Sequence, residues 1–521
     1  MKADALIVGA GPVGLTMAAE LKRFGLSIRI IDKDSGRTDK SKAIAVWPRT
    51  LELLDRTGGG VARRFIDAGL KTEYTNIFAG GERIAQVDLS SVDTPYKFIL
   101  LIQQSETERL LEEHLADLGT RVERQVELKT FEQSSDVVTC TLARADGSEE
   151  KVEASWLIGC DGAHSTVRHQ LGMSFEGSTM LNDWILADLH IDGMQGPPAG
   201  NIYWHAQGTL AVFPLGDTRY RVIADVGETA SKAIGEHGVP TLEEIQQILN
   251  VRGPKGLVAN NPVWLSGFAI NERKVADYRA QRVFLAGDAA HVHSPAGGQG
   301  MNTGMHDAFN LAWKLSLASR GLCAAEPLLA SYSPERSAVA KLVLEQTGRT
   351  TAMAVMKGET KQTVRNHVAS LIFGLAPVRH AMANTLSEVS VGYPDSPLNR
   401  SCDFEHSGPA PGKRAPIRND EPLVGEGTTP RFVLFAAEDD AIASVAREFT
   451  DILEPGLRTP YDRSGLWLVR PDGYVALRAK SGDAQAVREY LGVLRLQGDS
   501  FPSRNSRRFQ TEIIGQAHSL G

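Results

Sequence analysis

The sequence predicts an α/β fold with a parallel sheet, an antiparallel β layer and a small α/β unit at the C-terminal end. A helix-spaced segment, Pro12–Phe24, separates two short apolar runs, Ala3–Val8 and Ser27–Ile31, and this pattern is typical of a βαβ unit with parallel strands. Strand-like runs separated by glycine and proline turns fill Leu181–Ile270, as in an antiparallel layer. The C-terminal runs RFVLF and YVALRA and the helical AQAVREYLGVL predict a further α/β unit.

The parallel sheet is predicted by apolar spacing and by the turns that follow its strands. In the first helix, the apolar positions at helical spacing are Leu15, Ala18, Ala19 and Leu21. Gly25 then provides the helix end. Two later apolar runs, Trp156–Cys160 and Arg282–Ala286, are each followed by a turn that carries an aspartate. We expect them to join the same sheet, so that three strand ends converge.

The remaining segments predict the domain boundaries. Thr72–Thr94 and Leu181–Ile270 are expected to form an antiparallel layer over the ligand edge of the sheet. Asn302–Arg320 and Ser331–Leu386 are helical in pattern, and proline, glycine and charge cluster around Pro394–Pro430 as in a linker. The predicted domains are 1–71, 97–180 and 271–395 for the nucleotide-binding part, 72–96 and 181–270 for the antiparallel part, and 396–521 for the C-terminal part.

The composition excludes several classes of protein. Of 521 residues, 42% are hydrophobic, and the sequence has no run of about 18 apolar residues such as a membrane span needs. The net charge of −7 argues against binding to duplex nucleic acid, which usually requires a basic face. Glycines interrupt the apolar N-terminal stretch, so no signal peptide is expected. Widely spaced cysteines without a C-x-x-C pair favour a reducing, cytoplasmic setting. They are Cys140, Cys160, Cys323 and Cys402.

Residues Gly9–Gly14 (GAGPVG) form a G-x-G-x-x-G sequence between a strand and a helix, where a dinucleotide-binding turn is expected. Gly9 permits the tight turn, Gly11 lets backbone N–H groups approach a pyrophosphate, and Gly14 lets helix and strand pack closely. The helix N-terminus adds partial positive charge beside the phosphates. Asp32, at the end of the second strand, is placed to accept hydrogen bonds from a ribose. A glycine-rich turn without a ligand is the alternative, but the combination favours nucleotide binding.

A second glycine-rich loop follows the strand at 282–286. It begins with GDAAH at Gly287, continues through PAGGQGMN at Pro295–Asn302 and opens a helix. Such a loop presents backbone donors at a helix N-terminus, which would stabilise the negative charge at the N1 and O2 edge of a reduced flavin. For this loop alone, a plain connection with Asp288 as a helix cap is the alternative.

Three ordered segments resemble the FAD fingerprints of the single-component flavoprotein aromatic hydroxylases, which include p-hydroxybenzoate hydroxylase, phenol hydroxylase and the polyketide hydroxylases. The segments are GAGPVGL with Asp32, Leu157–Arg168 (LIGCDGAHSTVR) and Gly287–Leu315 (GDAAHVHSPAGGQGMNTGMHDAFNLAWKL). The resemblance spans residues 1–345. It implies a fold of the p-hydroxybenzoate hydroxylase type: a Rossmann-type FAD-binding domain, an inserted antiparallel β substrate domain and a C-terminal thioredoxin-like domain.

The resemblance implies roles for individual residues. Asp288 would bind the ribityl chain of FAD, and the backbone of Gly298–Asn302 would cradle the isoalloxazine ring. The turn at Asp161 and Gly162, with Arg168, would serve both FAD and the pyridine nucleotide.

Three further residues match family positions around FAD, and the Lys42 position is the one near the cofactor phosphates. Gln104 matches a glutamine that contacts FAD, and Pro295 matches a proline beside the reactive C4a edge. Lys42 lies where many members have an arginine, although lysine offers a point charge instead of a planar fork. The glycine fingerprint and the resemblance together predict these cofactor-binding residues: Gly9, Gly11, Pro12, Val13, Gly14, Asp32, Lys33, Lys42, Gln104, Asp161, Gly162, Arg168, Gly287, Asp288, Pro295, Gly298, Gly300, Met301 and Asn302.

Two C-terminal stretches resemble the thioredoxin-like domain of phenol hydroxylase and its polyketide-modifying relatives. They are Gly412–Pro416 (GKRAP) and Leu468–Ala476 (LVRPDGYVA). Because the sequence has no C-x-x-C pair, thiol–disulfide exchange is excluded for this domain. We expect it to be structural or to form a homodimer.

Several eye-catching side chains have two interpretations. His293 and Pro295 are the candidate catalytic residues, but histidines near a loop, His291 included, often only satisfy local backbone groups. Trp47 is a candidate for the substrate pocket, as are three residues of the antiparallel layer, and each could equally be core. Those three are Trp204, Phe213 and Pro214.

The sequence therefore predicts an FAD-dependent aromatic monooxygenase. The resemblance implies that NADPH or NADH reduces FAD, that O2 adds at flavin C4a to give a hydroperoxide, and that a phenolic or polycyclic aromatic ring attacks its terminal oxygen. The protein would exclude water and hold the ring in line. The expected partners are a small aromatic substrate and O2, with no metal, nucleic acid or membrane. A flavin reductase or dehydrogenase, or a non-catalytic flavin-binding sensor, remains the alternative.

Overall fold

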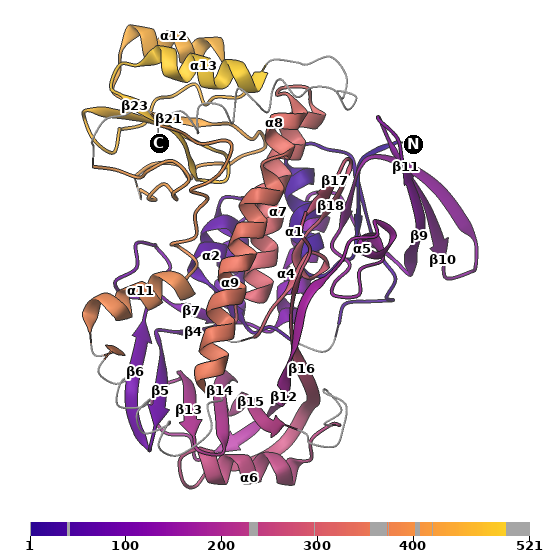
Figure 1. Cartoon of the computed structure of the whole chain (residues 1–521), viewed down its shortest axis with the longest axis vertical. Helices are drawn as coiled ribbons and strands as arrows, with labels where there is room; N and C mark the ends of the chain where they lie inside the picture. The colour runs from indigo at the N-terminus through magenta and orange to yellow at the C-terminus, as the bar shows by residue number, and fades with distance from the viewer. Residues whose placement is uncertain are drawn as a thin grey trace.

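The computed structural model describes residues 2–38, 42–228, 238–295, 297–354, 372–373, 375–401, 407–418 and 420–495. Within these residues the protein has three parts along its long axis (Figure 1). A sheet with its helices lies at the centre, a second sheet lies at one end, and a C-terminal sheet with two helices lies at the other. Cys402 and the predicted domain's last residues, 496–521, lie outside the described residues.

The central sheet contains the predicted βαβ unit. Its strand order is β17-β18-β11-β1-β2-β8, and β1 pairs in parallel with both β2 and β11. Its strands are β1 (Ala3–Val8), β2 (Ile28–Asp32), β8 (Glu123–Arg124), β11 (Glu149–Gly159), β17 (Arg279–Ala280) and β18 (Val283–Leu285), with β9 (Val126–Gln133) and β10 (Val138–Arg144) attached through β11. The ends of β1, β11 and β18 therefore converge, as their sequences predict, and bring the three fingerprint loops together.

Helices cover the central sheet, and α1 (Pro12–Arg23) packs against both α7 (Gly300–Ser319) and α4 (Gln104–Asp117). The structure starts α7 two residues before the predicted Asn302, so that Gly300 is its first residue. The other helices are α2 (Pro48–Asp55), α3 (Val61–Ala68), α5 (Thr166–Gln170), α6 (Leu242–Arg252), η1 (Gly287–Ala289), α8 (Ala325–Leu329), α9 (Tyr332–Ala354), α11 (Ala376–Leu386), α12 (Asp440–Glu448) and α13 (Ala484–Arg495). Among the described helices, none combines the length and the apolar character that a bilayer crossing requires.

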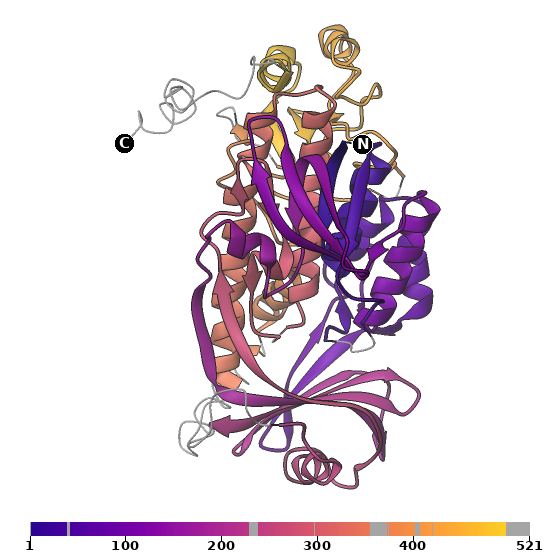
Figure 2. The same ribbon diagram turned by 90° about the vertical axis from the view of Figure 1, so that its right-hand side faces the viewer.

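The second sheet corresponds to the predicted antiparallel layer, with the strand order β19-β16-β12-β15-β14-β13-β5-β6. It differs from the prediction in one pairing, because β13 and β5 run parallel. Figure 2 shows its two long strands, β12 and β16, rising together along the central part. Its strands are β5 (Tyr74–Ala79), β6 (Glu82–Asp88), β12 (Glu176–Asp192), β13 (Gly200–His205), β14 (Gly208–Gly216), β15 (Arg219–Glu228), β16 (Val258–Lys274) and β19 (His291–Val292).

Two smaller sheets complete the fold. One has the order β3-β7-β4, in which β3 precedes α2 and β7 precedes α4 in the sequence. Its strands are β3 (Ala45–Val46), β4 (Leu70–Thr72) and β7 (Ile99–Leu101). The other forms the C-terminal part, with the order β20-β23-β22-β21 and with α12 and α13 beside it (Figure 1). Its strands are β20 (Arg400–Ser401), β21 (Val433–Phe435), β22 (Gly465–Val469) and β23 (Val475–Lys480).

A buried ionic cluster joins the C-terminal part to the central helices. Arg470 donates two hydrogen bonds to Glu335 of α9, at 2.6 and 3.0 Å, and Lys314 of α7 donates to the same carboxylate at 2.8 Å. The side chains of all three are fully buried. Trp313 packs edge-on against Phe432, within a hydrophobic core that continues from one part into the other. Because charges buried this deeply require their partners, the two parts are expected to stay together.

Candidate active site

The turn after β1 is shaped by its glycines. Gly9 has a φ of 99°, and a Cβ there would lie 2.4 Å from the carbonyl oxygen of Cys160. A Cβ on Gly14 would lie 1.9 Å from the carbonyl oxygen of Gly9, so the first turn of α1 and the loop need glycine to approach so closely. At Gly11, by contrast, a Cβ would have no described atom within 4 Å, and no described side chain caps the helix there. The helix N-terminus is therefore accessible to an anion.

Asp32, at the end of β2, braces this turn. One carboxylate oxygen, Oδ2, accepts a hydrogen bond from the backbone N–H of Ala10 at 2.6 Å, and Oδ1 accepts one from Asp34 at 2.9 Å. Asp32 remains partly exposed, and the side chain of Lys33 is exposed beside it. The carboxylate thus fixes the glycine turn and still presents lone pairs to a ligand.

The second fingerprint forms internal contacts. Asp161 accepts hydrogen bonds from the hydroxyl of Ser165 at 2.6 Å and from the N–H of Val167 at 3.2 Å, and Gly162 has a φ of 77°. Burial raises the pKa of the Asp161 carboxyl, while these bonds lower it. Arg168 donates to the backbone carbonyls of Ala163 and Ala289, at 2.7 and 3.1 Å. Arg168 therefore ties the second fingerprint to the third.

The third fingerprint begins at a tight contact with the first. A Cβ on Gly287 would lie 2.7 Å from a methyl group of Val13, which shows how closely η1 approaches α1. The neighbouring Asp288 is exposed at this junction. Although Asp288 is exposed, the protein atoms around its carboxyl partly desolvate that group and raise its pKa, while the charges of His291 and Lys42 lower it. An exposed carboxylate between the two glycine turns can accept hydrogen bonds from a hydroxylated ligand.

The loop before α7 is held by Trp47 and Asn302. The indole Nε1 of Trp47 lies 3.1 and 3.2 Å from the carbonyl oxygens of Gly297 and Gly298, to which it donates. The amide of Asn302 donates to the carbonyls of Ala45 and Gly298, at 2.9 and 3.1 Å. The sequence predicted a role for the backbone of Asn302, whereas the structure shows its side chain fastening the loop.

The start of α7 presents backbone donors beside this loop. Gly298 has a φ of 62°, and no side chain of the described residues caps the helix at Gln299. Gly300 opens the helix, while Met301 is half-buried against the central core. The carbonyl of Pro295 accepts a hydrogen bond from the N–H of Gly298 at 2.9 Å, which closes the loop. The loop is therefore preorganised, with the N–H groups of the first turn of α7 beside it.

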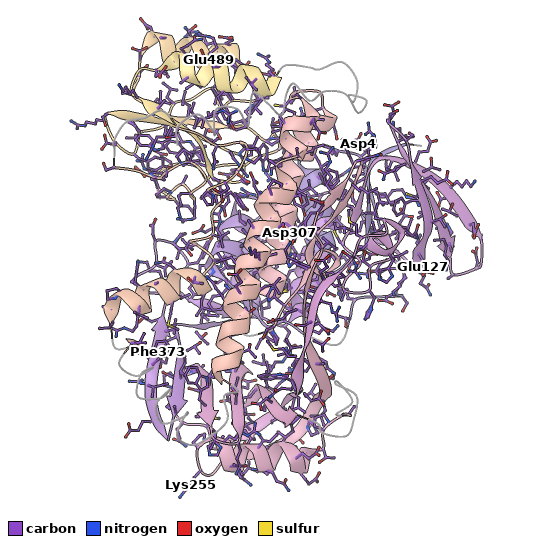
Figure 3. The ribbon with its side chains drawn as sticks, in the orientation of Figure 1. Asp4, Glu127, Lys255, Asp307, Phe373 and Glu489 are labelled. Carbon is purple, nitrogen blue, oxygen red and sulfur yellow. The ribbon has the colours of Figure 1, made fainter. Side chains whose placement is uncertain are left out.

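The two histidines of the third fingerprint lie in different surroundings. His291 is buried, and its Nε2 lies 2.9 Å from Oδ2 of Asp307. Asp307 lies near the centre of the molecule (Figure 3), and the charges of Arg336 and His291 overcome burial to lower its pKa to about 2. In His293, Nδ1 lies 2.9 Å from the carbonyl of Ser294, and Nε2 is buried without a hydrogen-bond partner among the described residues.

Burial lowers the pKa of His293 to about 4, helped by the charge of His291. The imidazole of His293 is therefore neutral at neutral pH and can exchange a hydrogen bond through Nε2 with a bound molecule. His291, through its bond to Asp307, belongs to the supporting structure.

Lys42 and Gln104 meet at the segment that precedes β3. The Lys42 side chain is exposed, whereas its carbonyl accepts a hydrogen bond from Arg221 at 2.9 Å. Gln104 accepts from the N–H of Ala43 at 3.2 Å and donates to Glu108 at 2.9 Å. Gln104 therefore positions the segment on which Lys42 lies.

An ion pair that the sequence analysis missed connects the second sheet to this segment. Arg221 of β15 is fully buried and forms two bonds of 2.6 Å to the carboxylate of Asp188 on β12. The same guanidinium donates to the carbonyl of Lys42. The available signal was a lone carboxylate inside the apolar run WILADL, because a charge in a buried strand requires a partner.

The aromatic candidates of the second sheet fall into two groups. Phe213 is half-buried in the same hydrophobic cluster as Trp47, and Pro214 next to it is buried. Trp204 lies in a different cluster and packs against Phe373, with ring centroids 6.4 Å apart. Figure 3 shows Phe373 beside the second sheet, away from Asp307 at the centre. The structure thus places Phe213 against the cluster that contains Trp47, and Trp204 in another cluster.

The fold and the site define a nucleotide-binding α/β flavoprotein. The residues fit FAD, because an uncapped helix N-terminus at Gly11, a carboxylate at Asp32 and a second helix N-terminus at Gly300 lie at the edge where the three fingerprints converge. The FAD binding domain family matches residues 2–347. The chain belongs to this family, that of the single-component FAD-dependent aromatic hydroxylases, and is an FAD-dependent monooxygenase.

Relatives cover nearly the whole chain. A 6-methylpretetramide 4-monooxygenase from Streptomyces rimosus is 32% identical over 94% of this chain and 93% of its own length. A pentachlorophenol 4-monooxygenase from Sphingobium chlorophenolicum is also 32% identical, over 92% of this chain and 90% of its own. The solved structure of an anhydrotetracycline hydroxylase from Streptomyces rimosus has a TM-score of 0.77 at 30% identity, covering 95% of this chain and 99% of that one.

Proposed function

We propose that the protein hydroxylates a fused polycyclic phenol with NADPH or NADH as the reductant. In the balanced reaction, one oxygen atom of O2 enters the aromatic C–H bond as a hydroxyl group, the other leaves as water, and NAD(P)H gives up two electrons. Bound FAD supplies the redox chemistry, accepting the hydride and activating O2. The relatives named for 6-methylpretetramide and anhydrotetracycline support a fused ring system as the substrate. Because another relative is named for pentachlorophenol, the experiment below also includes simple phenols.

The observation that carries this proposal is the preorganised loop between Trp47 and α7. Its carbonyls are occupied by Trp47 and Asn302, while the backbone donors of the first turn of α7 remain uncapped by the described side chains. Donors fixed in this way favour negative charge on a ring placed against them. We propose that the flavin ring lies here, the ribityl chain at Asp288 and the adenosine at Asp32, with Arg168 supporting the reductant's approach.

The substrate is proposed to lie between this loop and the second sheet. Arg221 of the second sheet bonds to the Lys42 carbonyl, and Phe213 shares a cluster with Trp47, so this sheet reaches the segment around β3. Phe213 and Pro214 would contact the aromatic ring, and His293 would offer its free Nε2. The second sheet would thus act as the substrate domain and exclude water from the reacting carbon.

A thioredoxin-like fold is proposed for the C-terminal part. Antiparallel pairing joins β21 to β22 and β22 to β23. Parallel bridges pair Phe432 with Leu453 and Phe435 with Arg458, so that β21 and the residue before it lie beside the segment that follows α12. This order, a βαβ unit followed by an antiparallel strand pair and a helix, supports the proposal. The buried pair of Arg470 and Glu335 favours a structural role over a mobile one.

The test measures NADPH, NADH and O2 consumption with and without a panel of simple phenols and fused polycyclic phenols. We expect consumption to rise with fused phenols, and the product to gain one oxygen atom that becomes heavy when 18O2 is supplied. Turnover without an oxygenated product would instead indicate a reductase. FAD binding without turnover would indicate a sensor, and in both cases the proposal would be abandoned.

A further inference from the structure

Glu388 occupies a backbone position that normally belongs to glycine. It is the second residue after α11, and its φ is 59°, in the left-handed region. Glycine is preferred at this place after a helix because a Cβ is crowded in that conformation. The side chain of Glu388 is also almost completely buried, at 1% exposure. A strained and buried acid costs stability, and such costs concentrate at functional sites.

The carboxyl group of Glu388 is only partly satisfied. The hydroxyl of Thr303, at the end of the first turn of α7, donates to Oε1 at 3.1 Å. The other oxygen, Oε2, has no hydrogen-bond partner among the described residues, and the nearest basic atom is Nε2 of His306, 3.5 Å away. Burial raises the pKa of Glu388 to about 8, although Thr303 and Arg336 lower it. At neutral pH this side chain is therefore mostly a neutral acid.

A chain of hydrogen bonds leads to the loop before α7 from His306, whose Nε2 lies 3.5 Å from Oε2 of the acid. Nε2 of His306 lies 2.9 Å from the hydroxyl of Thr50, which donates its single proton to Oδ1 of Asn302 at 2.8 Å. His306 must therefore donate to Thr50, which places its proton on Nε2. Asn302 in turn bonds to the carbonyl of Gly298. The acid and the loop are thus connected through three side chains.

The other charges around Glu388 are already compensated. On α7, Asp307 is paired with Arg336 of α9. On α2, Arg49 is paired with Glu52. Burial and the charges of Arg336 and Arg49 hold the pKa of His306 well below its usual range, so that imidazole stays neutral. His291 of β19 is also paired, with its Nε2 2.9 Å from Oδ2 of Asp307. Among these described groups, Glu388 has the carboxyl whose pKa burial raises to about 8.

We propose that Glu388 is a positioning residue of the flavin site, and that His306, Thr50 and Asn302 transmit a change in the charge of Glu388 to the loop at Gly297 and Gly298. While Glu388 is neutral, the partial positive charge at the start of α7 acts undiminished on the loop. When Glu388 ionises, its negative charge opposes that field, and the bond from His306 to Thr50 competes with one to Glu388. Because this rests on the proposed placement of the flavin ring, both must be tested together.

The experiment measures the dissociation constant of FAD on the apoprotein by flavin fluorescence, between about pH 6 and pH 10. In the unmodified protein we expect the dissociation constant to rise about threefold to tenfold through pH 8, the size of effect expected from one added buried charge. Glu388→Gln keeps the shape of the side chain and removes its charge. Its dissociation constant for FAD should equal that of the unmodified protein at low pH and should not rise through pH 8. Glu388→Gly, which also relieves the backbone, should lose the rise if Glu388→Gln does not fold.

The matched control is Glu272→Gln. Glu272 is another carboxyl whose pKa burial raises, but it lies on β16 of the second sheet, so this variant should keep the full rise. The midpoint potential of the bound flavin provides a second readout, because an extra negative charge disfavours the reduced ring. The unmodified protein should show an additional fall in potential above pH 8, and Glu388→Gln should not.

Two results would overturn the proposal: a dissociation constant that does not change across pH 8, or an unchanged rise in both Glu388 variants. A parallel measurement on Trp47→Phe separates this failure from that of the proposed function. If Trp47→Phe binds FAD as tightly as the unmodified protein and leaves the flavin spectrum unchanged, the ring does not lie at this loop. If Trp47→Phe weakens FAD binding while both Glu388 variants show the same rise in dissociation constant as the unmodified protein, the proposed flavin site is supported and the proposed role of Glu388 is wrong.

Discussion

The backbone N–H of Trp47 donates to Oδ1 of Asn302 at 3.0 Å, across 255 residues of sequence. The indole of the same tryptophan donates to the carbonyls of Gly297 and Gly298. The start of α2 and the start of α7 are therefore fastened to each other at the loop where the flavin ring is proposed to lie.

Trp47→Phe removes two hydrogen bonds to the glycine loop and keeps most of the buried ring. Each bond contributes about 0.5–1.5 kcal/mol, so we expect FAD affinity to fall by about tenfold and the flavin absorption spectrum to shift. Fluorescence titration of the apoprotein measures the first effect. Trp204→Phe serves as the control, since Trp204 packs against Phe373 in another cluster and should leave FAD affinity unchanged.

Gly14→Ala should lose stability, whereas Gly11→Ala should lose FAD binding. A Cβ on Gly14 would lie 1.9 Å from the Gly9 carbonyl, so the alanine forces the turn apart, and we expect a loss of stability of about 2 kcal/mol or more. At Gly11 the added methyl meets no described atom within 4 Å, so the variant should unfold at nearly the normal temperature but lose FAD. Thermal unfolding of the apoproteins and FAD titration distinguish the two. Equal loss of stability in both would contradict the expectation.

Arg470→Met should break the junction between the C-terminal part and the central helices. It leaves the buried carboxylate of Glu335 with Lys314 as its cationic partner, and removing one member of such a pair costs about 3–5 kcal/mol. Urea unfolding measures the loss. The comparison variant is Arg279→Met, which removes an ion pair to the exposed side chain of Glu326 and should cost about 1 kcal/mol or less.

The stability of Glu388→Gln relative to the unmodified protein should depend on pH. The pKa of Glu388 rises from its ordinary value of 4.5 to about 8 on folding. The folded protein holds the proton of Glu388 more tightly than the unfolded chain does. The free energy of unfolding is therefore at its full value below about pH 4.5 and falls as the pH rises to about 8. Glutamine does not titrate, so the variant should gain about 5 kcal/mol relative to the unmodified protein across this range. Urea unfolding at several pH values would show a constant difference if Glu388 did not titrate.

Much of the fold and part of the site could be predicted from the sequence. The glycine spacing at Gly9–Gly14 and the apolar runs on both sides of it define the βαβ unit, because each depends on neighbours a few residues away. The start of α7 was predicted within two residues. The parallel pairing of β5 with β13 was missed, since strand signals carry no direction when the partner is more than a hundred residues away.

Partners at long range account for the missed parts of the site. Arg221 lies in a strand-like run that predicts no partner for it, yet its guanidinium joins Asp188 to the Lys42 carbonyl. Trp204 and Phe213 have the same strand-like pattern, and only their surroundings separate one cluster from the other.

The sequence alone determined the nucleotide-binding turn, because that turn depends on glycine conformation and on spacing along a single strand–turn–helix unit. The family and the flavin were indicated by the resemblance of three ordered segments to the family's fingerprints. The tertiary structure alone decided that Trp47 and Asn302 fasten the loop and that Glu388 is buried beside His306. Those facts depend on which distant segments meet in the folded protein. Burial and pairing set the charge of a carboxyl, and a linear sequence contains neither.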